Sequence, residues 1–152
     1  MNRRAVLAAL PLLALPATPR AQQTRGAPAP PIALPAGMSP LPQGAWRLAF
    51  RAGQAELPAG VAPTLAEIGR RLADRPAGTG RITVEAQASG PANDASAARR
   101  LSLARATAVR AALVAGGLEE TRVDLRPLGR TPQALDCADI LPPGLQARAQ
   151  TR

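Results

Sequence analysis

The residues best suited to chemistry lie in a polar loop, residues 87–93, and in the helical pattern that follows it. Arg105 stands one helical turn after Leu101, so a helix that buries the leucine would hold the guanidinium in a fixed place near the loop. A fixed guanidinium can bind a carboxylate through two parallel N–H···O bonds. The spacing therefore predicts a carboxylate site with Arg105 as its donor.

The apolar pattern of the chain indicates the elements that must hold this loop. Alternating apolar residues are typical of half-buried strands, and apolar residues three or four apart are typical of helices that pack by one face. Strands are expected at residues 46–50, 81–86, 121–128 and 136–141. Helices are expected at residues 61–74 and from an N-cap at Asp94 or Ser96 to Gly116. The second helix should bury a stripe comprising Leu101, Ala104, Ala108, Val109, Ala112 and Leu113.

The order strand, helix, strand, helix, strand predicts a two-layer fold. Connections between parallel strands are nearly always right-handed, so both helices should cover the same face of the sheet. We therefore expect an α/β (α+β) domain over residues 45–141, a βαβαβ(β) sandwich whose two helices lie on one face of a small mixed sheet.

The first residues are typical of an export signal. Residues 1–21 combine Arg3 and Arg4 with an apolar run and end at a small residue, Ala21. The pattern predicts a secretory signal peptide that uses the Sec route, with twin-arginine export as the alternative. The apolar run is short and contains prolines, so no membrane-spanning helix is expected after the signal is removed.

Residues 22–44 are expected to form a proline-rich linker. Six prolines in this segment leave few backbone donors for a helix or a strand ladder, so we expect an extended spacer. The alternative interpretation is a polyproline ligand for a partner domain. After the last strand, residues 142–152 are expected to be a polar tail.

The composition argues against several classes of function. The formal net charge is +9 and all 19 basic residues are arginine, but they are scattered and the aromatic residues are Trp46 and Phe50 alone. A nucleic-acid interface with stacked bases is therefore not expected. The chain has no histidine and no metal-ligand spacing, so we expect no metal, no cofactor and no enzymatic activity. Cys137 is expected to be a partly buried small apolar residue, with pairing between two copies as the alternative in an oxidising compartment.

The second expected helix resembles one in a known family. Residues 101–106, LSLARA, followed by Val109 and Leu113, are similar to the corresponding helix of the OmpA/MotB C-terminal domains. Phe50 at the end of the first strand agrees with this family, and the resemblance spans residues 46–141. It implies a periplasmic βαβαββ domain that binds the diaminopimelate of peptidoglycan stem peptides without a covalent bond.

The resemblance also implies which residues meet the ligand, and it fails at one of them. Arg105 matches the family arginine and suits the carboxylate of diaminopimelate. The family aspartate that pairs with the amine is replaced by Ser89 or Gly90, depending on the loop length assumed, and a family asparagine is replaced by Ala98. Losing one partner of a desolvated charge pair costs about 2–5 kcal/mol, so binding should be weakened.

Two of these residues also have a structural interpretation. Asp94 either accepts a hydrogen bond from the amine of the ligand or caps the helix. Arg105 either contacts the ligand, is a solvated residue of the helix, or pairs with Glu85 or Asp94 to hold the loop. These alternatives remain open on the sequence alone.

The sequence thus predicts an exported protein of the periplasm and cell envelope that binds peptidoglycan weakly, with Arg105, Asp94, Ser89 and Gly90 as the site. The alternative is an OmpA-like fold that has lost this ligand and acts as a scaffold for an envelope protein partner.

Overall fold

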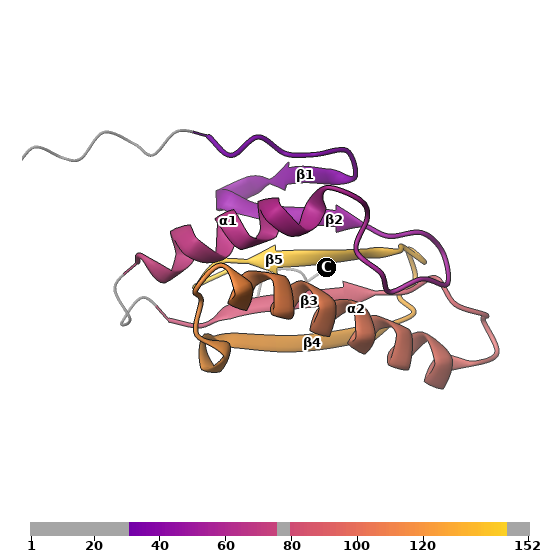
Figure 1. Cartoon of the computed structure of the whole chain (residues 1–152). Coiled ribbons are helices and arrows are strands. Elements are labelled where there is room, and N and C mark those ends of the chain that lie inside the picture. The colour runs from indigo at the N-terminus through magenta and orange to yellow at the C-terminus, as the bar shows by residue number, and fades with distance from the viewer. Residues whose placement is uncertain (1–30, 76–79, 146–152) are drawn as a thin grey trace, which may run out of the picture. The chain divides into compact units, whose positions relative to one another are not determined.

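The computed structural model describes residues 31–75 and 80–145, which form five strands and two helices (Figure 1). The strands are β1 (Met38–Leu41), β2 (Ala45–Ala49), β3 (Ile82–Gln87), β4 (Val123–Gly129) and β5 (Cys137–Leu141). The helices are α1 (Val61–Ala73) and α2 (Ala95–Ala115), and short 3-10 turns occupy Pro42–Gly44 and Glu120–Arg122. Neither α1 nor α2 combines the length and apolarity that crossing a membrane requires.

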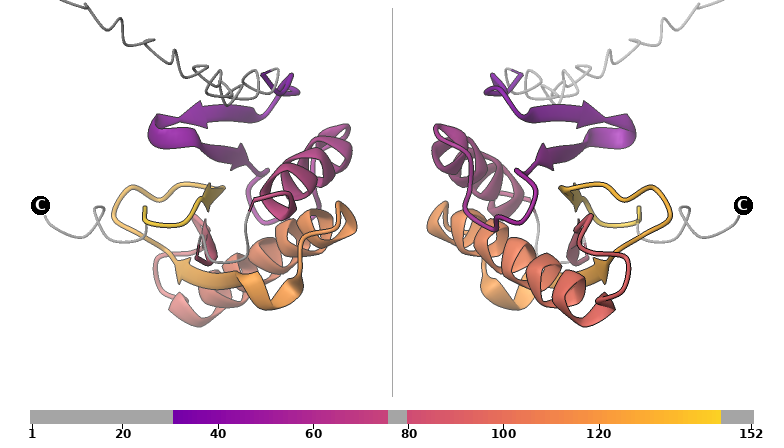
Figure 2. Two further views of the ribbon diagram at one scale, coloured as in Figure 1. Left: turned by 90° about the vertical axis from the view of Figure 1, so that its left-hand side faces the viewer. Right: turned by 90° about the vertical axis from the view of Figure 1, so that its right-hand side faces the viewer.

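The strands form one mixed sheet in the order β1-β2-β5-β3-β4. β3 and β4 are parallel and are joined through α2, whereas the other neighbouring strands are antiparallel. Both helices cover the same face of this sheet (Figures 1 and 2). The core between the two layers includes Leu48, Leu65, Ile68, Val84, Val109 and Ile140. The predicted two-layer α+β fold is confirmed, and the short last strand is present as β5.

β1 lies inside the segment that the sequence assigns to the linker. The prediction of a spacer without ladder hydrogen bonds over residues 22–44 is wrong for Met38–Leu41, which pairs antiparallel with β2. Pro40 is tolerated because β1 is an edge strand, and Met38 is held because its side chain is buried in the core. Residues 1–30 and 146–152, which carry the predicted signal, the start of the linker and most of the tail, lie outside the described residues.

The buried face of α2 differs from the predicted apolar stripe. Ala104 is exposed and Leu101 is half-buried, whereas Ser102 and Arg105 are buried. The hydroxyl of Ser102 accepts a hydrogen bond from the backbone N–H of Gly129 at 3.0 Å, so its burial leaves no polar atom unpaired. The buried face of α2 is therefore rotated relative to the predicted stripe. Apolar spacing cannot predict this rotation, because it does not identify polar residues that are buried together with hydrogen-bond partners.

Candidate functional site

Arg105 lies wholly inside the protein, at the end of the sheet where β3 ends and β5 begins. Nε donates to the carbonyl of Gln54 at 2.7 Å, and Nη2 donates to the carbonyl of Arg51 at 2.9 Å. Nη1 donates to the carbonyl of Gln87 and to Oδ1 of Asp136, both at 2.7 Å. The side chain has 0% exposed surface. One guanidinium therefore ties the loop after β2 to the end of β3 and to the residue before β5.

Phe50 completes the surroundings of this guanidinium. The carbon at the centre of the Arg105 guanidinium lies 5.0 Å from the centroid of the Phe50 ring, within the range of a cation–π contact. The backbone N–H of Phe50 donates to the carbonyl of Asp136 at 2.8 Å, so the same loop is also held through the main chain. A buried cation is costly unless it is paired and hydrogen-bonded, and Arg105 meets both conditions.

Asp136 supplies the negative charge of this cluster. Its Oδ1 accepts from Arg105 and, at 3.1 Å, from the backbone N–H of Ser89, while its side chain keeps 17% of its surface exposed. Burial alone would raise the pKa of Asp136, but the hydrogen bonds from Ser89 and the bond and charge of Arg105 outweigh it. The pKa of Asp136 is therefore lowered, and the pair stays ionised at neutral pH.

This lowered pKa predicts a pH dependence of stability. A carboxyl group whose pKa is lower in the folded state stabilises the protein above its unfolded value, about 3.9, and this stabilisation is lost as the pH falls through the folded value. We expect the difference in unfolding free energy between the wild type and Asp136→Asn to be constant above about pH 5 and to shrink toward pH 2. Urea unfolding at a series of pH values measures it. A difference that does not change with pH would contradict the ionised pair.

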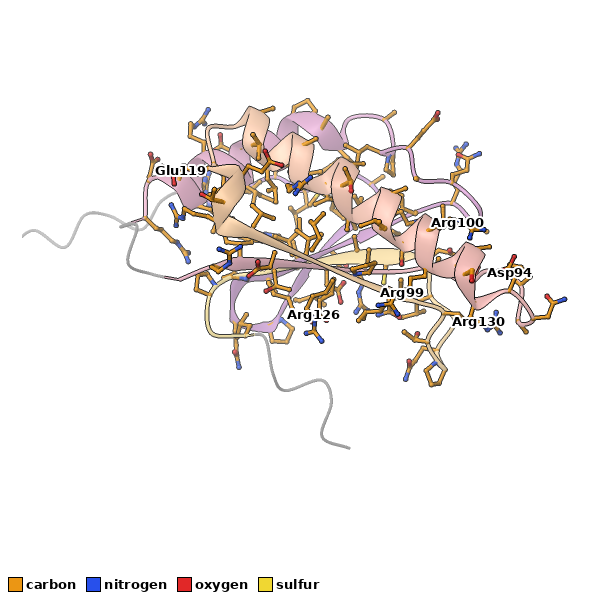
Figure 3. All side chains as sticks on the ribbon, turned by 90° about the horizontal axis from the view of Figure 1, so that it is seen from below. Asp94, Arg99, Arg100, Glu119, Arg126 and Arg130 are labelled. Atoms are coloured by element: carbon orange, nitrogen blue, oxygen red, sulfur yellow. The ribbon has the colours of Figure 1, made fainter. Side chains whose placement is uncertain are left out.

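The structure shows which groups Arg105 and Asp94 bind. Arg105 pairs with Asp136 and with neither Glu85 nor Asp94, since Glu85 forms an ion pair with Arg126. Asp94 is the N-cap of α2, and its Oδ1 accepts from the backbone N–H of Ala97 at 2.8 Å. Figure 3 shows Asp94 at the exposed end of that helix. The structure thus confirms the capping interpretation of Asp94.

Ser89 and Gly90, the two positions matched to the family aspartate, have structural roles in the loop. Ser89 holds Asp136 through its backbone, as described above. Gly90 has a φ of +41°, and a Cβ placed on it would lie 2.9 Å from Cβ of Ala98. An aspartate at position 90 would therefore be strained in its backbone and crowded against α2. The small residues at 90 and 98 fit one another.

Asp136 is the residue that the sequence-based site lacks. The sequence places it at the start of the last expected strand, with no link to Arg105. That link depends on the antiparallel pairing of β3 with β5, in which Gln87 lies opposite Cys137. A pattern of apolar residues predicts that a strand exists but not which strand it will pair with. Two acids, Asp136 just before the short strand β5 and Asp139 within it, are the one available hint.

Cys137 is more fully buried than expected, and burial raises the pKa of its thiol. Among the residues that the structure describes, no three histidine, cysteine, aspartate or glutamate side chains are grouped closely enough to hold a metal ion. The arrangement around Arg105 is an ion pair that anchors three loops.

A comparison with family models decides the relationship. The model described as the OmpA family matches residues 49–139, more than half of this chain. The chain belongs to the OmpA family. The match includes the loop after β2, the whole of α2 and β4, and both members of the Arg105–Asp136 pair. It confirms the resemblance noted from residues 101–106, and the search of curated proteins finds no match.

Solved structures share the fold of this OmpA-family chain. The peptidoglycan-associated lipoprotein from Burkholderia pseudomallei is 17% identical, with a TM-score of 0.53 over 62% of this chain and 87% of that chain. The periplasmic domain of Helicobacter pylori MotB is 13% identical, with a TM-score of 0.53 over 68% of this chain and 78% of that chain. At this level of identity the similarity establishes the fold alone.

Proposed function

We propose that this protein is exported to the periplasm and associates there with peptidoglycan without forming a covalent bond. The observation that carries the proposal is the family match over residues 49–139, which spans every loop at the Arg105 end of the sheet. Two proteins of the same fold are described as a peptidoglycan-associated lipoprotein and a periplasmic domain. The expected signal at residues 1–21 agrees with export, by the Sec route or the twin-arginine route.

The mode of binding that the family resemblance implies requires a rearrangement in this chain. The carboxylate of diaminopimelate could reach Arg105 only if Asp136 left its present place, because the guanidinium has no exposed surface. The ligand would replace one buried ion pair by another, and the carbonyls of Arg51 and Gln54 would have to stay in place. Binding through Arg105 is therefore expected to be weak.

The complete set of internal partners around Arg105 favours a second function. Arg105 already has an internal carboxylate and three carbonyl partners, which is what a purely structural arginine needs. An OmpA-family domain with such a filled site could serve as a scaffold for an envelope protein partner. This alternative predicts no affinity for peptidoglycan.

Co-sedimentation with purified peptidoglycan sacculi separates the two functions. We expect the purified protein to pellet with sacculi at low and at modest salt. If Arg105 receives the carboxylate of the ligand, Asp136→Asn should raise the pelleted fraction, because a neutral amide competes less well for the guanidinium. Asp94→Asn is the matched control, since it removes the same charge and asparagine still caps the helix.

The outcomes are distinct. Failure to pellet at modest salt overturns the association with peptidoglycan and leaves the scaffold function. Pelleting that Asp136→Asn leaves unchanged or lowers, relative to Asp94→Asn, supports the association but rejects Arg105 as the residue that binds the carboxylate.

A further inference from the structure

A row of four charged side chains crosses the face of the sheet that the helices leave uncovered. The register places Arg47 of β2 opposite Asp139 of β5, Asp139 opposite Glu85 of β3, and Glu85 opposite Arg126 of β4. Arg47 donates to both carboxylate oxygens of Asp139 at 2.7 Å, and Arg126 pairs with Glu85. The two acids thus lie side by side, with one arginine at each end of the row.

The arginines of this row are more accessible than the acids. Arg47 and Arg126 each expose 36% of their side chains, against 12% each for Asp139 and Glu85. A molecule that approaches this face therefore meets guanidinium groups first, with carboxylate oxygens beneath them. Figure 3 shows Arg126 on the side of the sheet away from the helices.

A cavity of about 630 Å³ lies over this row. One wall is the loop between β4 and β5, from which Arg130, Thr131, Pro132, Gln133 and Leu135 line the cavity. The loop is fixed in two places: Thr131 Oγ1 donates to Oε1 of Gln87 at 2.6 Å, and Nη1 of Arg130 donates to the carbonyl of Gly90 at 2.7 Å. The size falls within the range of about 300–1,000 Å³ that is usual for small-molecule sites.

Arg130 gives this cavity an excess of positive charge. Three arginines (47, 126 and 130) and two acids (85 and 139) line it, which leaves one net positive charge. Arg130 is exposed and donates through Nη1 alone, to the carbonyls of Ser89 and Gly90. Within the described residues its Nε and Nη2 donate no hydrogen bond to the protein. A ligand can therefore use them.

These groups point to a ligand with both acidic and N–H groups. A carboxylate can bind Arg130 or Arg126, while amide or ammonium N–H groups of the same molecule donate to Asp139 and Glu85. A phosphate fits less well, because its ionised oxygens only accept hydrogen bonds and it offers no N–H group to the carboxylates of Asp139 and Glu85. Leu128, Pro132 and Leu135 offer apolar contact for aliphatic parts of the ligand.

We infer that this cavity, on the opposite side of the sheet from the helices, binds a short acidic peptide. We assign this peptide to the stem of peptidoglycan. That assignment rests on the proposed function, whereas the acidic-peptide site itself does not. The chain can then bind an acidic stem peptide while Arg105 stays closed. Arg130 and Arg126 take the carboxylate contacts in place of Arg105.

Nuclear magnetic resonance titration of the isotope-labelled protein tests the inference. The probes are a stem tripeptide that contains diaminopimelate and the same tripeptide with its carboxylates converted to amides. We expect the acidic tripeptide to shift the backbone amides of Gln87, Leu128 and Thr131, and the amidated one to bind about tenfold more weakly, because hydrogen bonds to charged groups contribute the most. Equal binding of the two tripeptides overturns recognition of the acid.

Arg130→Gln is the variant that locates the site. It should weaken the acidic tripeptide about tenfold and leave the amidated one almost unchanged. Arg99→Gln is the matched control, because Arg99 is also exposed and does not line this cavity. Equal effects of the two variants, or shifts confined to residues around Arg105, overturn the inference.

The proposed function and this inference can fail separately. Tripeptide binding in the cavity without pelleting of sacculi rejects the association with peptidoglycan and supports the acidic-peptide site. Pelleting without tripeptide shifts in the cavity supports the association and rejects the site.

Discussion

Replacement of Arg105 by methionine is expected to lower the free energy of unfolding by about 3–5 kcal/mol, the usual cost of removing one partner from a buried ion pair. The change leaves Asp136 without its cation and removes the donors of three backbone carbonyls, those of Arg51, Gln54 and Gln87. Methionine fills a similar volume, so a cavity contributes little to the loss. Urea unfolding of the two proteins at neutral pH measures the difference.

The control for this variant is Arg100→Met, the same chemical change on the exposed side of the same helix. Arg100 is exposed, so a change within about 0.5 kcal/mol is expected. The double variant Arg105→Met/Asp136→Asn should recover part of the loss, because it no longer buries an unpaired carboxylate. A loss below about 1 kcal/mol for Arg105→Met would mean that the guanidinium does not hold the loops together.

The result also bears on function. If Arg105 carries this much stability, a ligand that draws it away from Asp136 must replace the whole cluster of bonds, including those to the carbonyls of Arg51 and Gln54. The family motif around Arg105 then identifies the fold, while the group that occupies its guanidinium in this chain comes from outside residues 101–106. That occupant is Asp136, which the motif does not include.

The apolar pattern was sufficient for most of the fold. Alternation at residues 46–50 and 81–86 and the helical spacing at 61–74 correspond to β2, β3 and α1 within one or two residues. β1 escaped detection because Pro40 argues against a strand everywhere except at an edge, and the sequence does not reveal which strand is the edge. Periodicity responds to the burial of a whole face, and β1 is only four residues long, with Met38 alone among them buried.

The candidate site was only half predictable for a different reason. Arg105 and Asp94 lie on one helix, where spacing along the chain gives position in space. Asp136 and the charged row depend on β5 lying between β2 and β3, a sheet order that chain order does not provide. Contacts between residues far apart in sequence, such as Arg47 with Asp139, are fixed by strand pairing and are therefore visible only in the folded structure.

The close approach of α1 and α2 leads to the second large effect. A Cβ added to Gly69 of α1 would lie 2.1 Å from the carbonyl oxygen of Leu113, and one added to Gly116 would lie 1.9 Å from the carbonyl oxygen of Ala66. Each glycine therefore faces the backbone of the other helical segment. Backbone atoms cannot turn aside as a flexible side chain can, so neither site can accept a methyl group unless the helices separate.

Gly69→Ala is accordingly expected to lower the free energy of unfolding by about 3 kcal/mol or more, at the upper end of the range for overpacked cores. The usual preference of helices for alanine over glycine, about 1 kcal/mol, acts in the opposite direction and is too small to compensate. Because α2 carries Arg105 and α1 follows the loop with Arg51 and Gln54, separation of the helices should also disturb the Arg105 cluster.

Gly117→Ala is the matched control for this prediction, because it makes the same change at a position with φ +101° and no atom within 4 Å of the added Cβ. It carries backbone strain without a collision, and we expect a loss of about 1–2 kcal/mol. Urea unfolding of both variants gives the comparison. If Gly69→Ala costs no more than Gly117→Ala, the two helices are not in backbone contact. The glycines would then have no role in placing Arg105 against its acceptors.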